Sequence, residues 1–220
     1  MRLRNKKWAG PWLAAHPDLV IGQTRATELK GHWADLFPRQ QPIQVEIGTG
    51  KGQFIIGMAK AYPDRNFIGM EIQESAVAVA ARKADEDGQP LPNLKFLYGD
   101  GAGVETYFEK GEIEKLYLNF SDPWPKHRHE NRRLTSPNFL KGYQSVLPKG
   151  GQLAFKTDNR GLFEYSLYSF AQFGVNFIPD GISLDLHADE DKMVDNVATE
   201  YEEKFSAKGF PIYQFIGQFN

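Results

Sequence analysis

The sequence has no cysteine among its 220 residues. Disulfide bonds, thiolate zinc sites and cysteine nucleophiles are therefore excluded, and nothing points to an oxidising compartment. Long hydrophobic runs are missing as well. No stretch is long and apolar enough to span a bilayer, and Pro11, Pro17 and Asp18 interrupt the region where a signal peptide would need its apolar core. We expect a soluble, cytoplasmic protein.

The chain also lacks an excess of charge of either sign, because 26 Lys and Arg stand against 28 Asp and Glu and leave a formal net charge of −2. Domains that coat nucleic acid by bulk electrostatics are usually strongly basic, so any nucleic-acid contact has to come from local patches. Two basic patches lie at residues 2–7 and 126–133, and an acidic stretch covers 185–195. This segregation is compatible with one basic face, although ordinary surfaces show it too.

The length and the hydrophobic content of 41% suit a single buried core. We expect an α/β domain over residues 41–220, with a basic arm and a helix over 1–40 that belong to the same unit. Before residue 43 the apolar residues are scattered among Pro, Gly and charge. This pattern predicts an irregular or partly mobile arm, followed by a helix near 26–36.

Short runs of β-branched or aromatic residues then alternate with longer amphipathic stretches. This alternation is typical of successive βα units and an open, mostly parallel sheet, and the last two runs indicate an antiparallel edge strand. The predicted strands are 43–47, 67–72, 94–98, 115–120, 153–156, 175–178 and 212–219, and the predicted helices are 53–61, 74–86, 137–146 and 162–173.

Acidic residues fall at or just after the ends of five predicted strands. The carboxyl ends of parallel strands lie along one edge of a sheet, and ligands bind there at the point where the strand order reverses. Surface acids also end strands by chance, but five repetitions favour a shared ligand site. The residues are Glu46, Glu71, Asp100, Asp122 and Asp158.

A glycine loop follows the first of these strands, with Gly48, Gly50 and Gly52 in the pattern Gly-x-Gly-x-Gly. Dinucleotide folds usually show Gly-x-Gly-x-x-Gly, but position 53 is Gln. Glu46 would oppose a phosphate, yet it could pair with the cationic amino-acid end of S-adenosylmethionine (SAM). The loop therefore favours SAM over a nicotinamide cofactor. The alternative is that the glycines only permit tight strand-to-helix packing.

Two further acids suit the same cofactor. Glu71 lies 23 residues after Gly48, the spacing at which an acid accepts hydrogen bonds from both ribose hydroxyls in NAD and SAM binders alike. Asp100 could accept from the adenine amino group, as the corresponding position does in many SAM sites.

Three blocks of residues together resemble the bacterial tRNA (guanine-N7)-methyltransferases. Their order and spacing are kept from about residue 43 to the end of the chain. The glycine loop is generic to SAM enzymes, whereas Asp-Pro-Trp-Pro-Lys followed by a basic run is specific. The blocks are 46–52, then 121–126 with Arg128, His129, Arg132 and Arg133, then 199–202.

This resemblance implies a single-domain, Rossmann-like class I methyltransferase fold with helices on both faces of the sheet. It implies methyl transfer from SAM to N7 of a guanosine in the variable loop of tRNA, by a monomer or a homodimer. Glu46, Gly48, Gly50, Gly52, Glu71, Asp100 and Asp122 would bind SAM, and Asp122 would be catalytic. Lys126 and Asp158 would contact the substrate, Arg128, His129, Arg132 and Arg133 would meet RNA, and Thr199, Glu200, Tyr201 and Glu202 would help to hold the target base.

The chemistry suits this assignment, because N7 of guanine is an in-plane lone pair that carries no proton. It needs no general base, so positioning should dominate, and proximity and orientation can supply roughly 7–11 kcal/mol of a barrier. Asp122 would accept hydrogen bonds from guanine N1–H and its exocyclic amine, or would orient SAM.

Several of these residues have simpler interpretations. Trp124 could stack on a base or turn into the core. His127 and His129 lack a third ligand at a recognisable spacing, so we expect no metal. The block 199–202 also matches a helix capping box, and Gly209 would end that helix.

Two other functions compete with the tRNA assignment. A SAM methyltransferase for a small molecule or a protein would explain the cofactor site but not the basic run. A nicotinamide oxidoreductase, or a non-catalytic nucleotide-binding module, would explain the glycine loop alone.

Overall fold

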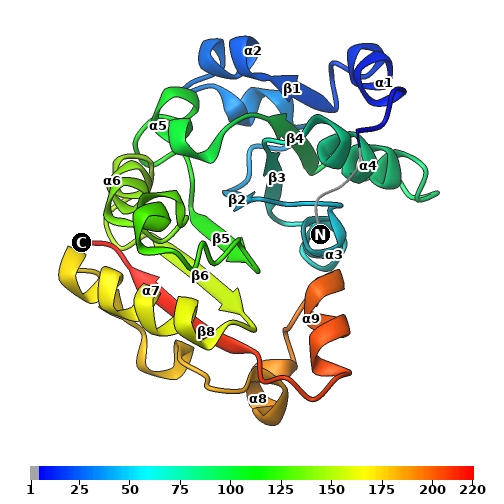
Figure 1. Cartoon of the computed structure of the whole chain (residues 1–220). Coiled ribbons are helices and arrows are strands. Elements are labelled where there is room, and N and C mark those ends of the chain that lie inside the picture. Colours follow the sequence, from blue (N-terminus) through cyan, green and yellow to red (C-terminus); the bar gives the residue numbers. More distant parts are fainter. Residues whose placement is uncertain (1–4) are drawn as a thin grey trace.

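The computed structural model describes residues 5–220, so Arg2 and Arg4 of the basic arm lie outside the described residues. Its centre is an eight-stranded sheet in the order β1-β4-β3-β2-β5-β6-β8-β7 (Figure 1). The strands from β1 to β6 in this order run parallel, and β8 pairs antiparallel with β6 and β7. The bounds are β1 Val20–Gly22, β2 Ile43–Ile47, β3 Asn66–Glu71, β4 Leu94–Tyr98, β5 Lys115–Asn119, β6 Gln152–Thr157, β7 Asn176–Phe177 and β8 Tyr213–Gln218.

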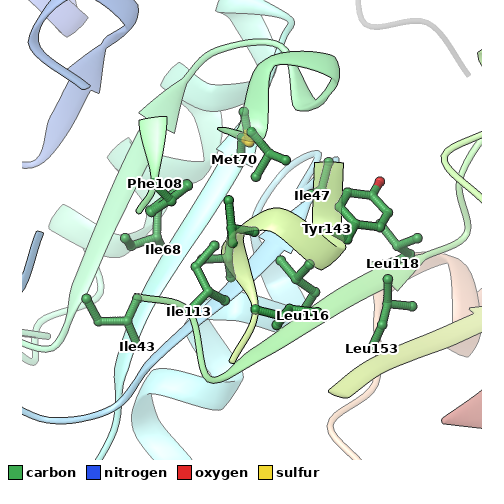
Figure 2. Close-up of a cluster of buried hydrophobic side chains, with 14 of the residues drawn as sticks. Ile43, Ile47, Ile68, Met70, Phe108, Ile113, Leu116, Leu118, Tyr143 and Leu153 are labelled. Carbon is green, nitrogen blue, oxygen red and sulfur yellow. The ribbon is translucent and has the colours of Figure 1, made fainter. Parts of the chain in front are cut away.

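Helices cover both faces of this sheet. One core, part of which Figure 2 shows, lies between the sheet and α2, α5, α6 and α7, and the other lies between the sheet and α3 and α4. The α-helices of the described residues are α1 Ala9–Ala15, α2 Gln23–Glu28, α3 Gln53–Ala61, α4 Glu74–Asp85, α5 Val104–Tyr107, α6 Pro137–Val146, α7 Arg160–Phe173, α8 Glu190–Met193 and α9 Glu200–Ser206. Short 3₁₀ turns are η1 Trp33–Leu36, η2 Gly101–Gly103, η3 His127–Arg132, η4 Pro179–Gly181 and η5 Leu186–Ala188.

The predicted α/β fold, with its mostly parallel sheet and antiparallel edge, is confirmed. All seven predicted strands and the four predicted helices after residue 43 exist, with bounds shifted by at most two residues, except that only 176–177 of the predicted strand 175–178 is paired. Within residues 5–220 no helix is both long and apolar enough to cross a membrane.

The prediction for the first 40 residues is wrong in two respects. The supposed irregular arm contains α1 and β1, and β1 pairs with β4. Trp12 and Leu13 of α1 pack on the α3–α4 core. The helix has only seven residues, which is too short for its apolar residues to show a helical period in the sequence. The helix expected near 26–36 is split into α2 and η1, because Gly31 has a φ of +83° between them.

The strand order reverses next to β2, since β3 and β4 lie on one side of it and β5 and β6 on the other. The glycine loop leaves β2 at this point. Gly48, Gly50 and Gly52 all have positive φ, a conformation that side chains with a Cβ rarely adopt. A Cβ on Gly52 would lie 2.8 Å from the Ala80 Cβ, so this glycine also lets α3 approach α4.

Gly52→Ala should therefore lower the free energy of unfolding by about 2–5 kcal/mol, the sum of the left-handed backbone cost and overpacking. Gly88→Ala is the matched control, because Gly88 has φ +75° but no atom within 4 Å of a built Cβ. The control should cost only about 1–2 kcal/mol. Urea denaturation measures both, and equal losses would contradict the packing role of Gly52.

Candidate active site

The carboxyl ends of the parallel strands bring three predicted acids together at the strand-order reversal. Glu46 lies within β2, Glu71 ends β3, and Asp122 follows β5. The charge of Glu71 acts on Glu46, and the charge of Asp122 acts on Glu71. We call these three residues the carboxylate site.

Glu46 is buried at the centre of this site, with 2% of its surface exposed. Its Oε2 accepts a hydrogen bond from Thr49 Oγ1 at 2.6 Å, and its Oε1 accepts one from Asn119 Nδ2 at 2.8 Å. Burial raises the pKa of Glu46 to about 7, although both hydrogen bonds and the charge of Lys156 oppose the rise. Glu46 is thus a desolvated carboxylate that a cation would stabilise.

Glu71 joins the glycine loop to the start of α4. Its Oε2 accepts from the Gly50 N–H and its Oε1 from the Gln73 N–H, both at 2.9 Å. Burial raises the pKa of Glu71, these backbone bonds lower it, and Asp122 adds to the rise. Each oxygen keeps a second lone pair with which to accept from a ligand.

The other two acids lie further out. Asp100 is exposed, and its Oδ1 accepts from the Ala102 N–H at 2.9 Å, so it caps η2. Asp158 directly follows β6 and is partly exposed. Both occupy the strand edge that the sequence predicted.

Asp122 is exposed on a loop with unusual backbone geometry. Phe120 and Trp124, on either side of it, have φ values of +51° and +40°. Such conformations in residues other than glycine cost about 1–3 kcal/mol each and persist only where surrounding contacts hold them. The strain indicates that the loop from 120 to 124 is held in a defined shape.

Arg133 supplies some of those contacts. Its Nε and Nη2 donate to the carbonyl oxygens of Pro123 and Trp124 at 3.1 and 3.2 Å, and its guanidinium lies 4.1 Å from the centroid of the Tyr165 ring. Arg133 therefore helps to hold this loop in shape, and its contact with RNA stays a prediction. The rest of the basic run remains accessible: Lys126, Arg128 and Arg132 are exposed.

Trp124 neither turns fully into the core nor lies fully exposed for stacking on a base. It is half-buried, with the Arg132 guanidinium 4.9 Å from its ring centroid and the His129 ring edge-on at 5.6 Å. The basic run and the loop that carries Asp122 therefore form one surface.

The helix α9 lies beside the glycine loop, and Figure 1 shows it in orange next to α3. Lys51 of the loop pairs with Glu200 at 2.8 Å, and the Tyr201 ring stacks on Phe120 with centroids 6.3 Å apart. The Thr199 half of the predicted capping box is confirmed, because Thr199 Oγ1 accepts from the Glu202 N–H at 2.9 Å, whereas the Glu202 side chain bonds elsewhere. The segment 199–202 thus contacts both the glycine loop and the loop that carries Asp122.

Glu202 itself is fully buried. Its carboxylate accepts hydrogen bonds from Lys156 at 3.1 Å, Asn196 at 2.6 Å and His187 at 3.1 Å. These bonds anchor α9 from inside the fold, and a role of Glu202 in holding the target base stays a prediction.

Sequence reasoning missed Asn119 and Lys156. Asn119 ends β5 and binds Glu46, while Lys156 stands in β6 with 6% of its surface exposed. A lysine inside the run Leu-Ala-Phe-Lys-Thr was the available signal, because a buried lysine needs an acidic partner. Across residues 5–220 no cluster of three or more His, Asp or Glu side chains could hold a metal ion.

Residues 40–215 match the protein family described as "Putative methyltransferase". The chain is 61% identical to the tRNA (guanine-N(7)-)-methyltransferase of Leuconostoc mesenteroides subsp. mesenteroides, with 100% of each chain covered. It is 55% identical to the protein of that name from Pediococcus pentosaceus, again with 100% of each chain covered.

Solved structures support the fold at much lower identity. The 16S rRNA methyltransferase KamB has a TM-score of 0.61 at 14% identity, covering 90% of this chain and 94% of its own. A 16S rRNA (adenine(1408)-N(1))-methyltransferase from Catenulisporales acidiphilia, solved with its cosubstrate SAM, has a TM-score of 0.53 at 11% identity, covering 99% and 93%. The class I methyltransferase fold is confirmed. By its full-length relatives, this chain belongs to the bacterial tRNA (guanine-N7)-methyltransferase family.

Proposed function

We propose that this protein transfers the methyl group of SAM to N7 of a guanosine in the variable loop of tRNA. The observation that carries the proposal is the convergence of Glu46, Glu71 and Asp122 at the strand-order reversal, beside an exposed basic run. Full-length relatives named for this activity support it.

The glycine loop and the carboxylates fit SAM. A Cβ on Gly48 or Gly50 would meet nothing closer than 4.0 Å, so the loop has room on the side where a ligand would lie. SAM supplies an electrophilic methyl group on a sulfonium. Glu46 would pair with the ammonium of its amino-acid end, and Glu71 would accept from the ribose hydroxyls. Asp100 would accept from the adenine amine, and Ile72, which is 54% exposed, would offer an apolar surface to the ring.

Asp122 would hold the guanine. An exposed carboxylate on a strained, well-held loop can accept from N1–H and the exocyclic amine together, a donor pair that adenine lacks. Lys126 and Asp158 would contact the substrate, and Thr199, Glu200 and Tyr201 would help to hold the target base from the side of α9. Because N7 carries no proton, these residues only need to align the lone pair with the methyl group.

The exposed basic residues should bind the tRNA backbone. Replacing both Arg128 and Arg132 with Ala should weaken tRNA binding. The slope of the logarithm of the tRNA binding constant against the logarithm of the salt concentration should decrease in magnitude by about 0.7–0.9 for each phosphate that the protein no longer neutralises. The affinity for S-adenosylhomocysteine should stay unchanged. Arg82→Ala and Arg160→Ala, which remove exposed arginines from α4 and α7, are the controls. An unaltered salt slope would show that the basic run does not bind phosphate.

We also propose that residues 1–40 and 41–220 act as one unit, because β1 extends the sheet and the Lys6 N–H donates to Ser75 Oγ of α4 at 2.8 Å.

A thermal shift and a labelling assay test the function. S-adenosylhomocysteine should raise the melting temperature and NAD should not, since only a ligand that binds the native state stabilises it. With labelled SAM and bulk tRNA, the label should enter tRNA. Stabilisation by NAD alone would refute the cofactor assignment. Label in protein or small molecules, with none in tRNA, would favour the competing methyltransferase.

A further inference from the structure

A buried lysine lies between two carboxylates that come from distant parts of the chain. Lys156 is the penultimate residue of β6, and its Nζ lies 3.1 Å from Glu202 Oε2 of α9. The same amine donates to Asn196 Oδ1 and, at 3.3 Å, to the Val197 carbonyl. Its three donors therefore all serve the C-terminal segment that leads into α9.

The amine also acts on the carboxylate site. Lys156 is the direct neighbour of Asn119 across the β5–β6 pairing, and Asn119 binds Glu46. The charge of Lys156 lowers the pKa of Glu46 against the effect of burial. Burial in turn lowers the pKa of Lys156, while Glu202 and Glu46 raise it. The charge states of Lys156 and Glu46 thus depend on one another, and the carboxylate of Glu202 favours the charged form of the lysine.

Fixing Glu202 fixes the rest of α9. The helix begins at Thr199, whose side chain caps it, and its first turn carries Glu200 onto Lys51 and Tyr201 onto Phe120. One buried ion pair therefore sets the position of a helix that contacts both the glycine loop and the loop of Asp122.

We propose that Lys156 is a positioning residue that couples the two halves of the active site: it holds α9 through Glu202 and counterbalances the carboxylate of Glu46. This inference rests on the proposed function, because it assigns Glu46 to the ammonium of SAM. Lys156 touches neither substrate nor cofactor and acts through these two acids.

If the Lys156–Glu202 pair had only a structural role, replacing both residues with apolar ones would not change cofactor binding in a pH-dependent way. Replacing both members of a buried pair with apolar residues of similar volume often leaves stability unchanged, so such a variant can fold and still reveal the second role. Lys156→Met with Glu202→Met removes the pair and leaves Glu46 without its cation. The groups that face Glu46 would then be the acid Glu71 and the neutral Thr49 and Asn119.

The test measures the Kd for S-adenosylhomocysteine as a function of pH by calorimetry. The variants are Lys156→Met, the double variant and the conservative Lys156→Arg. Lys115→Met is the control, because Lys115, like Lys156, is a strand lysine over an aromatic ring, but it is half-buried and lies at the opposite end of the neighbouring β5. Melting temperatures identify any variant that does not fold.

Loss of a nearby positive charge should raise the pKa of Glu46 by about one unit. At pH 7 the ionised fraction would fall from about a half to about a tenth, so Kd for the double variant should rise roughly fivefold. The defect should shrink as the pH approaches about 9, where Glu46 ionises in both proteins. Lys156→Arg should restore most of the affinity, and Lys115→Met should match the wild type.

Two results overturn the proposal. One is a folded double variant with wild-type Kd at every pH, and the other is a loss of affinity that does not depend on pH, which would indicate a structural role alone. A wild-type protein that does not bind S-adenosylhomocysteine would instead refute the proposed function, so the two failures are distinguishable.

Discussion

Replacing Asp122 with Ala should reduce kcat for tRNA methylation by a factor on the order of 10²–10³ or more, the usual loss when a hydrogen-bonding group that acts on the reacting centre is removed. The side chain is exposed, so its removal should change the free energy of unfolding by no more than about 0.5 kcal/mol. Single-turnover kinetics with saturating SAM, together with urea denaturation, measures both quantities.

Asp180→Ala is the control for this variant, because Asp180 is another exposed aspartate, in η4, away from the carboxylate site. It should methylate tRNA at the wild-type rate. If Asp122→Ala retained wild-type turnover, Asp122 would have no part in catalysis. If Asp122→Ala unfolded easily and Asp180→Ala did not, the loop would have a structural role that its exposure does not suggest.

Replacing Glu46 with Gln should make the protein more stable and almost unable to bind SAM. Gln can still accept from Thr49 or Asn119 through its amide oxygen, but it cannot neutralise an ammonium. Breaking a buried, hydrogen-bonded charge pair typically costs about 2–5 kcal/mol, so the KM for SAM should rise on the order of 10²-fold. Glu164→Gln, an exposed acid paired with Arg160, should leave the KM unchanged.

The gain in stability follows from the pKa of Glu46. Burial raises that pKa from the ordinary value of 4.5 to about 7, so the folded state holds this proton more tightly than the unfolded chain does. The resulting stability is fully present below about pH 4.5 and is lost as the pH rises through 7. The loss amounts to about 3 kcal/mol. At pH 8, Glu46→Gln should therefore resist urea better than the wild type, with little difference at pH 4.5.

A Glu46→Gln variant that is less stable than the wild type at pH 8 would contradict the desolvated state of this carboxylate. A variant with unchanged KM for SAM would contradict its role in cofactor binding. The two measurements are independent, because urea denaturation is carried out without ligand.

The sheet and the helices after residue 43 could be predicted because the central strands β2, β3, β5 and β6 are almost wholly buried and read as short runs dominated by apolar and aromatic residues. The convergence of Glu46, Glu71 and Asp122 followed from topology alone, since the carboxyl ends of parallel strands share one edge. Local patterns also sufficed for the Thr199 cap, whose donor is three residues away.

The contacts that the sequence did not reveal are tertiary. Lys156 and Glu202 are 46 residues apart, so their pairing and the burial of Glu202 have no local signal. Arg133 appears in the sequence as one more member of a basic run, and only the fold brings its guanidinium to the carbonyls of Pro123 and Trp124. The contacts that hold the site therefore had to come from the fold, and the roles of Glu46, Glu71 and Asp122 stay predictions.

The most direct test of this account identifies the methylated atom. The protein is incubated with SAM and unmodified tRNA, the tRNA is cut by nuclease, and the fragments are examined by mass spectrometry. We predict one new methyl group, on N7 of a guanosine in the variable loop, formed by the wild type and absent with Asp122→Ala. A methyl group on another base or atom, or unmodified tRNA after incubation with protein that binds S-adenosylhomocysteine, would contradict it.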